Sequence, residues 1–85
     1  MITQLAPICL FTYNRLDETK QTIYHLKNNN LAKKSQLFIF SDGPKKNKID
    51  ELKVFKLREY LKQVNGFRSV EIYESNINQG LANSI

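Results

Sequence analysis

The sequence is poor in the residues that cross-link or interrupt small proteins. Its 85 residues include one cysteine, one histidine, three glycines, two prolines and no tryptophan. The single cysteine, Cys9, excludes an internal disulfide and lies in an apolar run, so we expect it to be a small buried hydrophobe. With 41% hydrophobic and 25% charged residues, the composition is that of an ordered globular domain.

Long apolar runs are also missing. The longest covers residues 5–11 and is interrupted by Pro7, whereas a membrane-spanning helix needs about 20 apolar residues. No lysine or arginine precedes this run, so it does not resemble a secretory leader. We therefore expect no membrane span and a cytoplasmic location.

The common signatures of nucleotide-binding and hydrolytic proteins are absent. No G-x-G-x-x-G follows the first apolar run, which disfavours the common dinucleotide-binding fold, and no G-x-x-x-x-G-K-[ST] is present to form a P-loop. The one histidine, His25, lies within a predicted helix, where a solvated or packing role is favoured over catalysis.

The charge is unbalanced, because 13 lysines and arginines against 8 acids give a net charge of +5. Lys45, Lys46 and Lys48 cluster, but no aromatic residues alternate with them to form a base-stacking platform. A solvated helix face in a mildly phosphate-attracting field is the favoured interpretation. The alternative is a small basic module that binds RNA or another polyanion through this cluster and the following helix.

Hydrophobic patterning predicts a β-α-β-α-β-α order. Strands are expected at residues 6–13, 37–40 and 69–74, and helices at about residues 17–27 and 47–65 and from residue 81. The first strand is apolar throughout, which is typical of a strand covered on both faces. Such alternation predicts a parallel sheet with helices packed on its faces.

Apolar spacing also predicts which side of each helix faces the core. In the first helix, Leu16, Ile23 and Leu26 share a face with Thr19. In the second, the expected core residues are Ile49, Leu52, Phe55, Leu61 and Val64. Asn28 and Gly66 are expected to stop the two helices.

Polar clusters follow each predicted strand, at residues 12–15, 41–43 and 76–80. The carboxyl ends of parallel strands meet at one edge of a sheet, and ligands of open α/β sheets bind outside that edge. The sequence therefore predicts a binding site there, without naming the ligand.

Three segments carry a more specific pattern: PICLFTYNR (residues 7–15), FIFSDGP (residues 38–44) and VEIYESNINQGLANSI (residues 70–85). Together they resemble the start of a family 2 glycosyltransferase of the A-type fold. In that family a strand ending in T-Y-N-R, a strand ending in an acidic turn and a later N-x-G-L-A segment follow in this order. The S-D-G-P turn is similar to that of the N-acetylglucosaminyltransferase-like branch, and the resemblance covers nearly the whole chain.

The resemblance implies a nucleotide site. Thr12, Tyr13 and Asn14 would line the nucleobase pocket, largely through backbone groups, and Arg15 would face the diphosphate. From the residues alone, a surface charge is the favoured interpretation of Arg15, and the alternative for Tyr13 is a strand-end residue half in the core.

The other implied site residues follow the second and third strands. Asp42 would accept a hydrogen bond from the uracil imide, a discriminating contact because an unpaired buried carboxylate is costly. Asn78 and Gly80 would shape the start of the third helix, whose free N–H groups favour an anion. The alternatives are a turn residue for Asp42, a helix N-cap for Asn78 and simple backbone freedom for Gly80.

The resemblance further implies a truncated A-type glycosyltransferase fold. We expect a three-layer α/β/α, Rossmann-like half-domain with a parallel sheet in the order 3-2-1. The parent activity would be transfer of a hexosyl or N-acetylhexosaminyl group from a nucleotide sugar, uridine-linked, to a glycan acceptor in polysaccharide biosynthesis. Mg²⁺ or Mn²⁺ would stabilise the leaving diphosphate.

The chain departs from that family in one respect. The D-x-D or E-D-D segment that holds the divalent cation is not found after Gly80, nor is a catalytic base. We therefore expect residues 1–85 to be an incomplete, N-terminal nucleotide-binding part that holds no catalytic residue and transfers no sugar. A third interpretation is a non-catalytic assembly domain that forms a homodimer through an uncovered strand edge.

Overall fold

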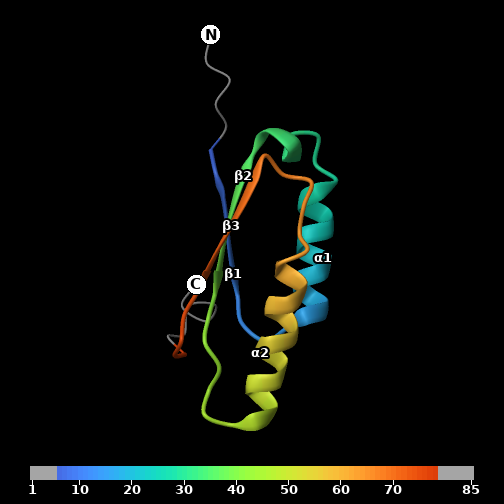
Figure 1. The fold of residues 1–85 in the computed structure, drawn as a ribbon. Coiled ribbons are helices and arrows are strands. Elements are labelled where there is room, and N and C mark those ends of the chain that lie inside the picture. The colour runs from blue at the N-terminus through green and yellow to red at the C-terminus, as the bar shows by residue number, and fades with distance from the viewer. Residues whose placement is uncertain (1–5, 79–85) are drawn as a thin grey trace.

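The computed structural model describes residues 6–78, which form a three-stranded parallel sheet and two α-helices (Figure 1). In chain order the elements are β1 (Ile8–Thr12), α1 (Leu16–Lys27), the 3-10 turn η1 (Ala32–Lys34), β2 (Gln36–Ser41), α2 (Lys48–Leu61) and β3 (Ser69–Glu74). β2 lies between β1 and β3, which confirms the predicted order 3-2-1. Within this range neither helix has the length and hydrophobicity that crossing a bilayer requires.

The strands pair in parallel and in level register. Thr12 at the end of β1 lies opposite Ser41 of β2, which lies opposite Glu74 at the end of β3. The chain segments that leave the three strands therefore start from the same edge of the sheet.

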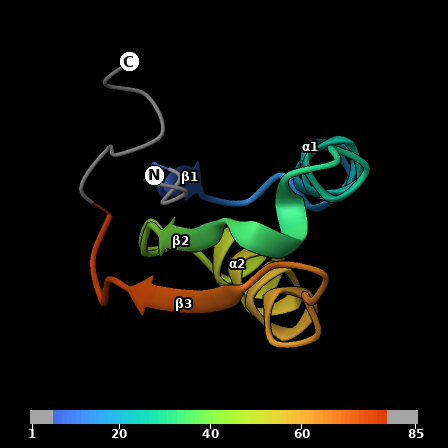
Figure 2. The same cartoon turned by 90° about the horizontal axis from the view of Figure 1, so that it is seen from above.

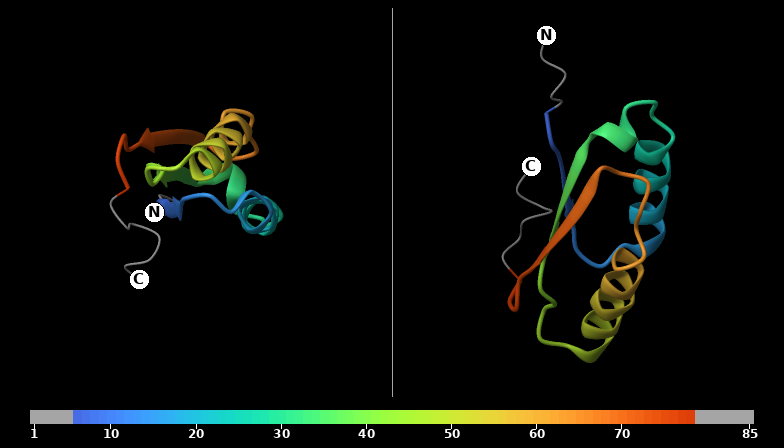
Figure 3. Two further views of the ribbon diagram at one scale, coloured as in Figure 1. Left: turned by 90° about the horizontal axis from the view of Figure 1, so that it is seen from below. Right: turned by 45° about the horizontal axis from the view of Figure 1, so that its top comes forward.

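Both helices pack on the same face of the sheet, as the views from above and below show (Figures 2 and 3). The two connections, β1 to β2 and β2 to β3, both step in the same direction across the sheet. Because such connections are right-handed, their helices lie on the same face. The described residues thus form two layers instead of the expected three. The third predicted helix, from residue 81, lies outside the described residues.

The core fills the space between the sheet and the two helices. Its fully buried members are Ile23 of α1, Leu37 and Ile39 of β2, and Leu57 and Leu61 of α2. Burying a side chain of this size contributes about 1.5–3 kcal/mol, so these residues hold the layers together.

Among residues 6–78, no helix covers the opposite face of the sheet (Figure 2). Cys9 is exposed and Phe11 is 40% exposed, because α1 covers only the alternate residues Ile8 and Leu10. The expectations that β1 is covered on both faces and that Cys9 is buried are therefore wrong for the described residues.

The buried side of α2 also differs from the expectation. Val54, Leu57 and Leu61 are buried, whereas Ile49, Leu52 and Phe55 are exposed. Leu61 is thus assigned correctly, but the helix is rotated about its axis relative to the predicted core face.

The helix ends follow from capping. The Asn47 side chain accepts a hydrogen bond from the Asp50 amide at 2.7 Å, which starts α2. Asn28 follows the last residue of α1, as predicted. The second helix does not extend to Gly66, the expected stop, but already ends at Leu61. Gly66 lies in the turn before β3, with a φ of +93° that glycine adopts without strain.

Candidate functional site

The carboxyl edge of the sheet is tied together by backbone hydrogen bonds. The Asp42 amide donates to the Thr12 carbonyl at 2.9 Å, and the Ser75 amide donates to the Ser41 carbonyl at 2.9 Å. The polar clusters that follow the strands are therefore brought together at one edge of the sheet.

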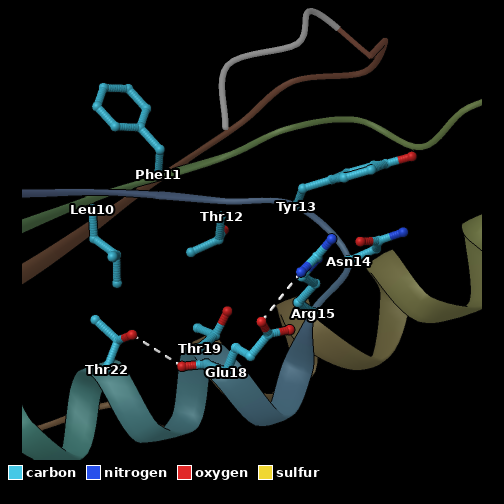
Figure 4. Close-up of a pocket in the computed structure, with 9 residues that line it drawn as sticks. All are labelled: Leu10, Phe11, Thr12, Tyr13, Asn14, Arg15, Glu18, Thr19 and Thr22. Carbon is cyan, nitrogen blue, oxygen red and sulfur yellow. Dashed lines mark hydrogen bonds and ion pairs between the residues drawn. The ribbon is translucent and has the colours of Figure 1, made fainter. Parts of the chain in front are cut away.

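A hollow of about 370 Å³ lies at this edge, between the end of β1 and the first turns of α1 (Figure 4). It is lined by Leu10, Phe11, Thr12, Tyr13, Asn14, Arg15, Glu18, Thr19 and Thr22. Leu10 and Thr12 point toward the helix, whereas Phe11 points to the other side of the strand. Four of the predicted site residues, 12–15, thus line one hollow.

The side chains of Tyr13 and Asn14 bind within the protein. The Tyr13 hydroxyl donates a short hydrogen bond to one carboxylate oxygen of Asp50, and the Asn14 amide donates to the other at 2.7 Å. The Lys45 backbone amide donates to the same carboxylate at 2.6 Å. Asp50 is only 6% exposed, so this network fixes the end of β1 to the start of α2.

The network changes the acidity of both partners. Burial, and then the bond to Asp50, raises the pKa of Tyr13 to about 12. Burial alone would raise the pKa of Asp50, but the hydrogen bonds from Tyr13, the Lys45 amide and Asn14 outweigh it and lower the pKa. A neutral tyrosine bound to an ionised aspartate is therefore the form that the fold favours.

Asp42 lies outside the hollow. The residue is only 1% exposed, and one of its carboxylate oxygens accepts a hydrogen bond from the Gly43 amide at 2.8 Å. A Cβ on Gly43 would lie 2.5 Å from the backbone of Ile77, so glycine is required where the two segments touch. The loop after β3 therefore packs directly against the turn that holds Asp42.

Arg58 of α2 joins the ends of β2 and β3. Its guanidinium donates to the Ser41 hydroxyl at 2.9 Å and to three carbonyl oxygens, those of Ser41 at 3.2 Å, Asp42 at 3.1 Å and Ser75 at 2.7 Å. Glu74 lies 3.8 Å away as an ion-pair partner. The guanidinium thus binds carbonyl oxygens from the ends of both strands at once, at the edge of the sheet.

The remaining predicted site residues are Arg15, Asn78 and Gly80, of which Arg15 and Asn78 line different hollows. Arg15 is exposed and pairs with Glu18 at 3.2 Å. The Asn78 side chain donates to the Gly43 carbonyl at 3.1 Å and lines a second hollow of about 520 Å³ together with Lys45 and Lys46. Gly80 lies outside the described residues.

Two residues that organise this edge were not predicted. Asp50 lies three residues after Asn47, which fits a capping position at the start of the helix but does not indicate contacts with the end of β1. Nothing in the local pattern around Arg58 distinguishes it from the other basic residues of α2, since all its acceptors lie at least 16 positions away or in other elements.

The described residues do not fit a divalent cation. Among residues 6–78 no group of three or more histidine, cysteine, aspartate or glutamate side chains is placed to hold one. The three groups that surround the Asp50 carboxylate are hydrogen-bond donors, which already occupy both oxygens.

Comparison with known proteins gives no assignment for this edge of the sheet. No protein family, curated protein or solved structure matches the chain.

Proposed function

We propose that the carboxyl edge of the sheet binds the nucleoside diphosphate part of a uridine-linked nucleotide sugar, in the hollow beside residues 12–15. The observation that carries this proposal is the hollow itself. It lies where open parallel sheets bind ligands, and its volume of about 370 Å³ is in the range of small-molecule sites.

The lining suits a ligand with an apolar ring and an anionic tail. Leu10 supplies apolar surface for a base, and the hydroxyl groups of Thr19 and Thr22 supply polar contacts. Arg15 supplies a positive charge, and the N-terminus of α1, at Leu16, favours an anion. A phosphate would compete with Glu18 for Arg15, because the two side chains are paired in the free protein.

The predicted contact between Asp42 and uracil has a structural requirement. Asp42 is buried, and its neighbour Gly43 contacts the backbone of Ile77, so we expect a base to reach the carboxylate only when these segments move apart. Ligand binding by way of Asp42 would therefore be accompanied by a change at Ile77, whereas binding in the hollow alone would leave Ile77 in place.

The wider activity is a proposal by resemblance. Transfer of a hexosyl or N-acetylhexosaminyl group to a glycan acceptor would follow from membership of the family 2 glycosyltransferases, for which the alternating parallel fold is a necessary condition. Because the described residues do not form a divalent-cation site, we derive no transfer step from them.

The test is a titration of ¹⁵N-labelled protein with UDP, monitored by backbone amide shifts, with AMP and a short RNA as controls. We expect UDP alone to shift the amides of residues 12–15. Arg15→Ala should weaken UDP binding about fivefold, corresponding to about 1 kcal/mol for an exposed charge. Arg68→Ala, which removes an exposed arginine before β3, is the matched control and should bind as the wild type does.

The same titration separates the alternative. Lys45 and Lys46 are exposed, and both line the second hollow. Shifts at residues 45–48 on adding RNA, with none on adding UDP, would replace the nucleotide-sugar proposal by a polyanion-binding module. Loss of those shifts at high salt would identify the contact as one with phosphates.

A further inference from the structure

The open face of the sheet carries a row of aromatic rings. Phe11, Phe40 and Tyr73 lie opposite one another on the three strands, and their rings stack with centroids 5.2 Å and 5.3 Å apart. Phe38 extends the row, with its ring 6.5 Å from that of Tyr73. Phe11 and Tyr73 are 40% and 48% exposed, and both helices are on the other side (Figure 2).

This aromatic face is acidic. The outward residues of the neighbouring row are Cys9, Phe38 and Glu71, and the Glu71 carboxylate accepts a hydrogen bond from the Tyr73 hydroxyl at 2.8 Å. No lysine or arginine occurs in the three strands. Phosphate groups are therefore disfavoured there, and an apolar partner with positive charge at its margin is favoured.

The outer side of α2 has that chemistry. Ile49, Leu52 and Phe55 are 72%, 52% and 59% exposed, on the side of the helix away from the buried Val54 and Leu57. The exposed lysines of the same helix are Lys48, Lys53 and Lys56. Two exposed acids, Glu51 and Glu59, also lie on this helix, and Glu59 is paired with Lys62 at 2.9 Å. An apolar stripe flanked by lysines is thus left without a partner among the described residues.

The two surfaces also match in size. The stripe from Ile49 to Phe55 extends about 9 Å along the helix at 1.5 Å per residue. The aromatic row extends about 10 Å across three strands at about 4.8 Å per strand spacing. Parallel sheets are normally covered by helices on both faces, so a helix is the expected cover.

We propose that α2 of one copy of this chain docks on the aromatic face of a second copy, with the lysines of α2 beside Glu71. Both helices lie on the other side of the sheet, so α2 cannot cover the aromatic face of its own molecule (Figure 1). The contact is therefore heterologous, and each copy offers its helix to one neighbour and its sheet to another.

The test is sedimentation of the 85-residue chain over a range of concentrations. We expect the wild type to exceed the mass of one chain, 9.9 kDa, as its concentration rises. Leu52→Glu places a negative charge on the stripe, and Tyr73→Lys places a positive charge on the aromatic face, where the lysines of α2 would dock. Each variant should remain at the mass of one chain. Tyr24→Glu, which replaces an exposed aromatic residue of α1, should associate as the wild type does.

Mixing the two variants gives the decisive measurement. Tyr73→Lys keeps an intact helix and Leu52→Glu keeps an intact sheet, so an equimolar mixture should form a dimer of twice the mass of one chain and nothing larger. Circular dichroism must show that each variant is folded. If one is not, Glu71→Lys replaces Tyr73→Lys and Ile49→Glu replaces Leu52→Glu.

Three outcomes would overturn the proposal. A wild type that remains a single chain at all concentrations shows that the surfaces do not bind. A mixture that remains monomeric shows that an intact α2 does not bind an intact aromatic face. Variants that associate as well as the wild type point to pairing through the open edges of β1 or β3, which neither substitution touches.

Discussion

At the residue scale, the described part of the chain depends on one carboxylate more than on any other polar group. Asp50 accepts hydrogen bonds from a tyrosine, an asparagine and a backbone amide, and these partners belong to the end of β1 and to the turn before α2. Because the residue is buried, each donor left unpaired would lose its hydrogen bond without full access to water.

Asp50→Asn should lower the free energy of unfolding by about 2–3 kcal/mol at neutral pH, because it removes charge-assisted hydrogen bonds. The folded state lowers the pKa of Asp50 below its ordinary 3.8, so its contribution is complete above that value and is lost as the pH falls through the folded-state pKa. Urea unfolding at neutral and acidic pH should show the variant and wild type converging in acid. Asp17→Asn, at an exposed acid, is the control.

Tyr13→Phe should show the opposite pH dependence. The pKa of Tyr13 is raised from 10.0 to about 12, so the hydroxyl stabilises the fold below pH 10 and its contribution is lost between those values. We expect the variant to be about 1 kcal/mol less stable than the wild type at neutral pH. Urea unfolding below pH 10 and near pH 12 should show that difference disappear in alkali. A difference that persists unchanged there would contradict the role given to the hydroxyl.

At the element scale, α2 explains where sequence patterns succeed and fail. Apolar residues occur all round this helix, so two series with a spacing of about three compete for the core side. The series through Val54, Leu57 and Leu61 is buried, and the series through Ile49, Leu52 and Phe55 is exposed. Only the positions of the strands decide between them, and a helical period alone does not contain that information.

The strands were easier to predict than the site. β3 begins and ends where the alternation of Val70 and Ile72 predicts, and the order of all the described elements follows from the same patterning. The bond between Tyr13 and Asp50 joins residues 37 positions apart, so it depends on how the elements pack. Local patterning therefore finds the edge of the sheet but not the contacts that organise it.

Arg58→Met tests how far one side chain joins two strands. Its guanidinium holds carbonyl groups of both β2 and the segment after β3, so its loss should cost about 3 kcal/mol and speed amide exchange at Ser75. Arg58→Lys should recover only part of this, since an ammonium cannot reach all the acceptors at once. Lys62→Met is the control at an exposed position, and equal effects of Arg58→Met and Lys62→Met on exchange at Ser75 would contradict the assignment.

At the scale of the whole molecule, the described residues form a two-layer structure with a different surface on each side. One side presents the sheet with its stacked rings. The other side presents two helices (Figure 3). The asymmetry follows from two crossovers that move the same way across the sheet. It explains why apolar residues that patterning assigns to a core are found on the surface in both layers.

The strand order has a consequence for how the protein is made. Each strand pairs with the strand that follows it in the chain, β1 with β2 and β2 with β3. During synthesis, β1 and β2 can therefore pair before α2 leaves the ribosome. The later strand β3 then adds to a pair of strands that already exists. No strand has to wait for a distant one, so this sheet can assemble in the order in which it is translated.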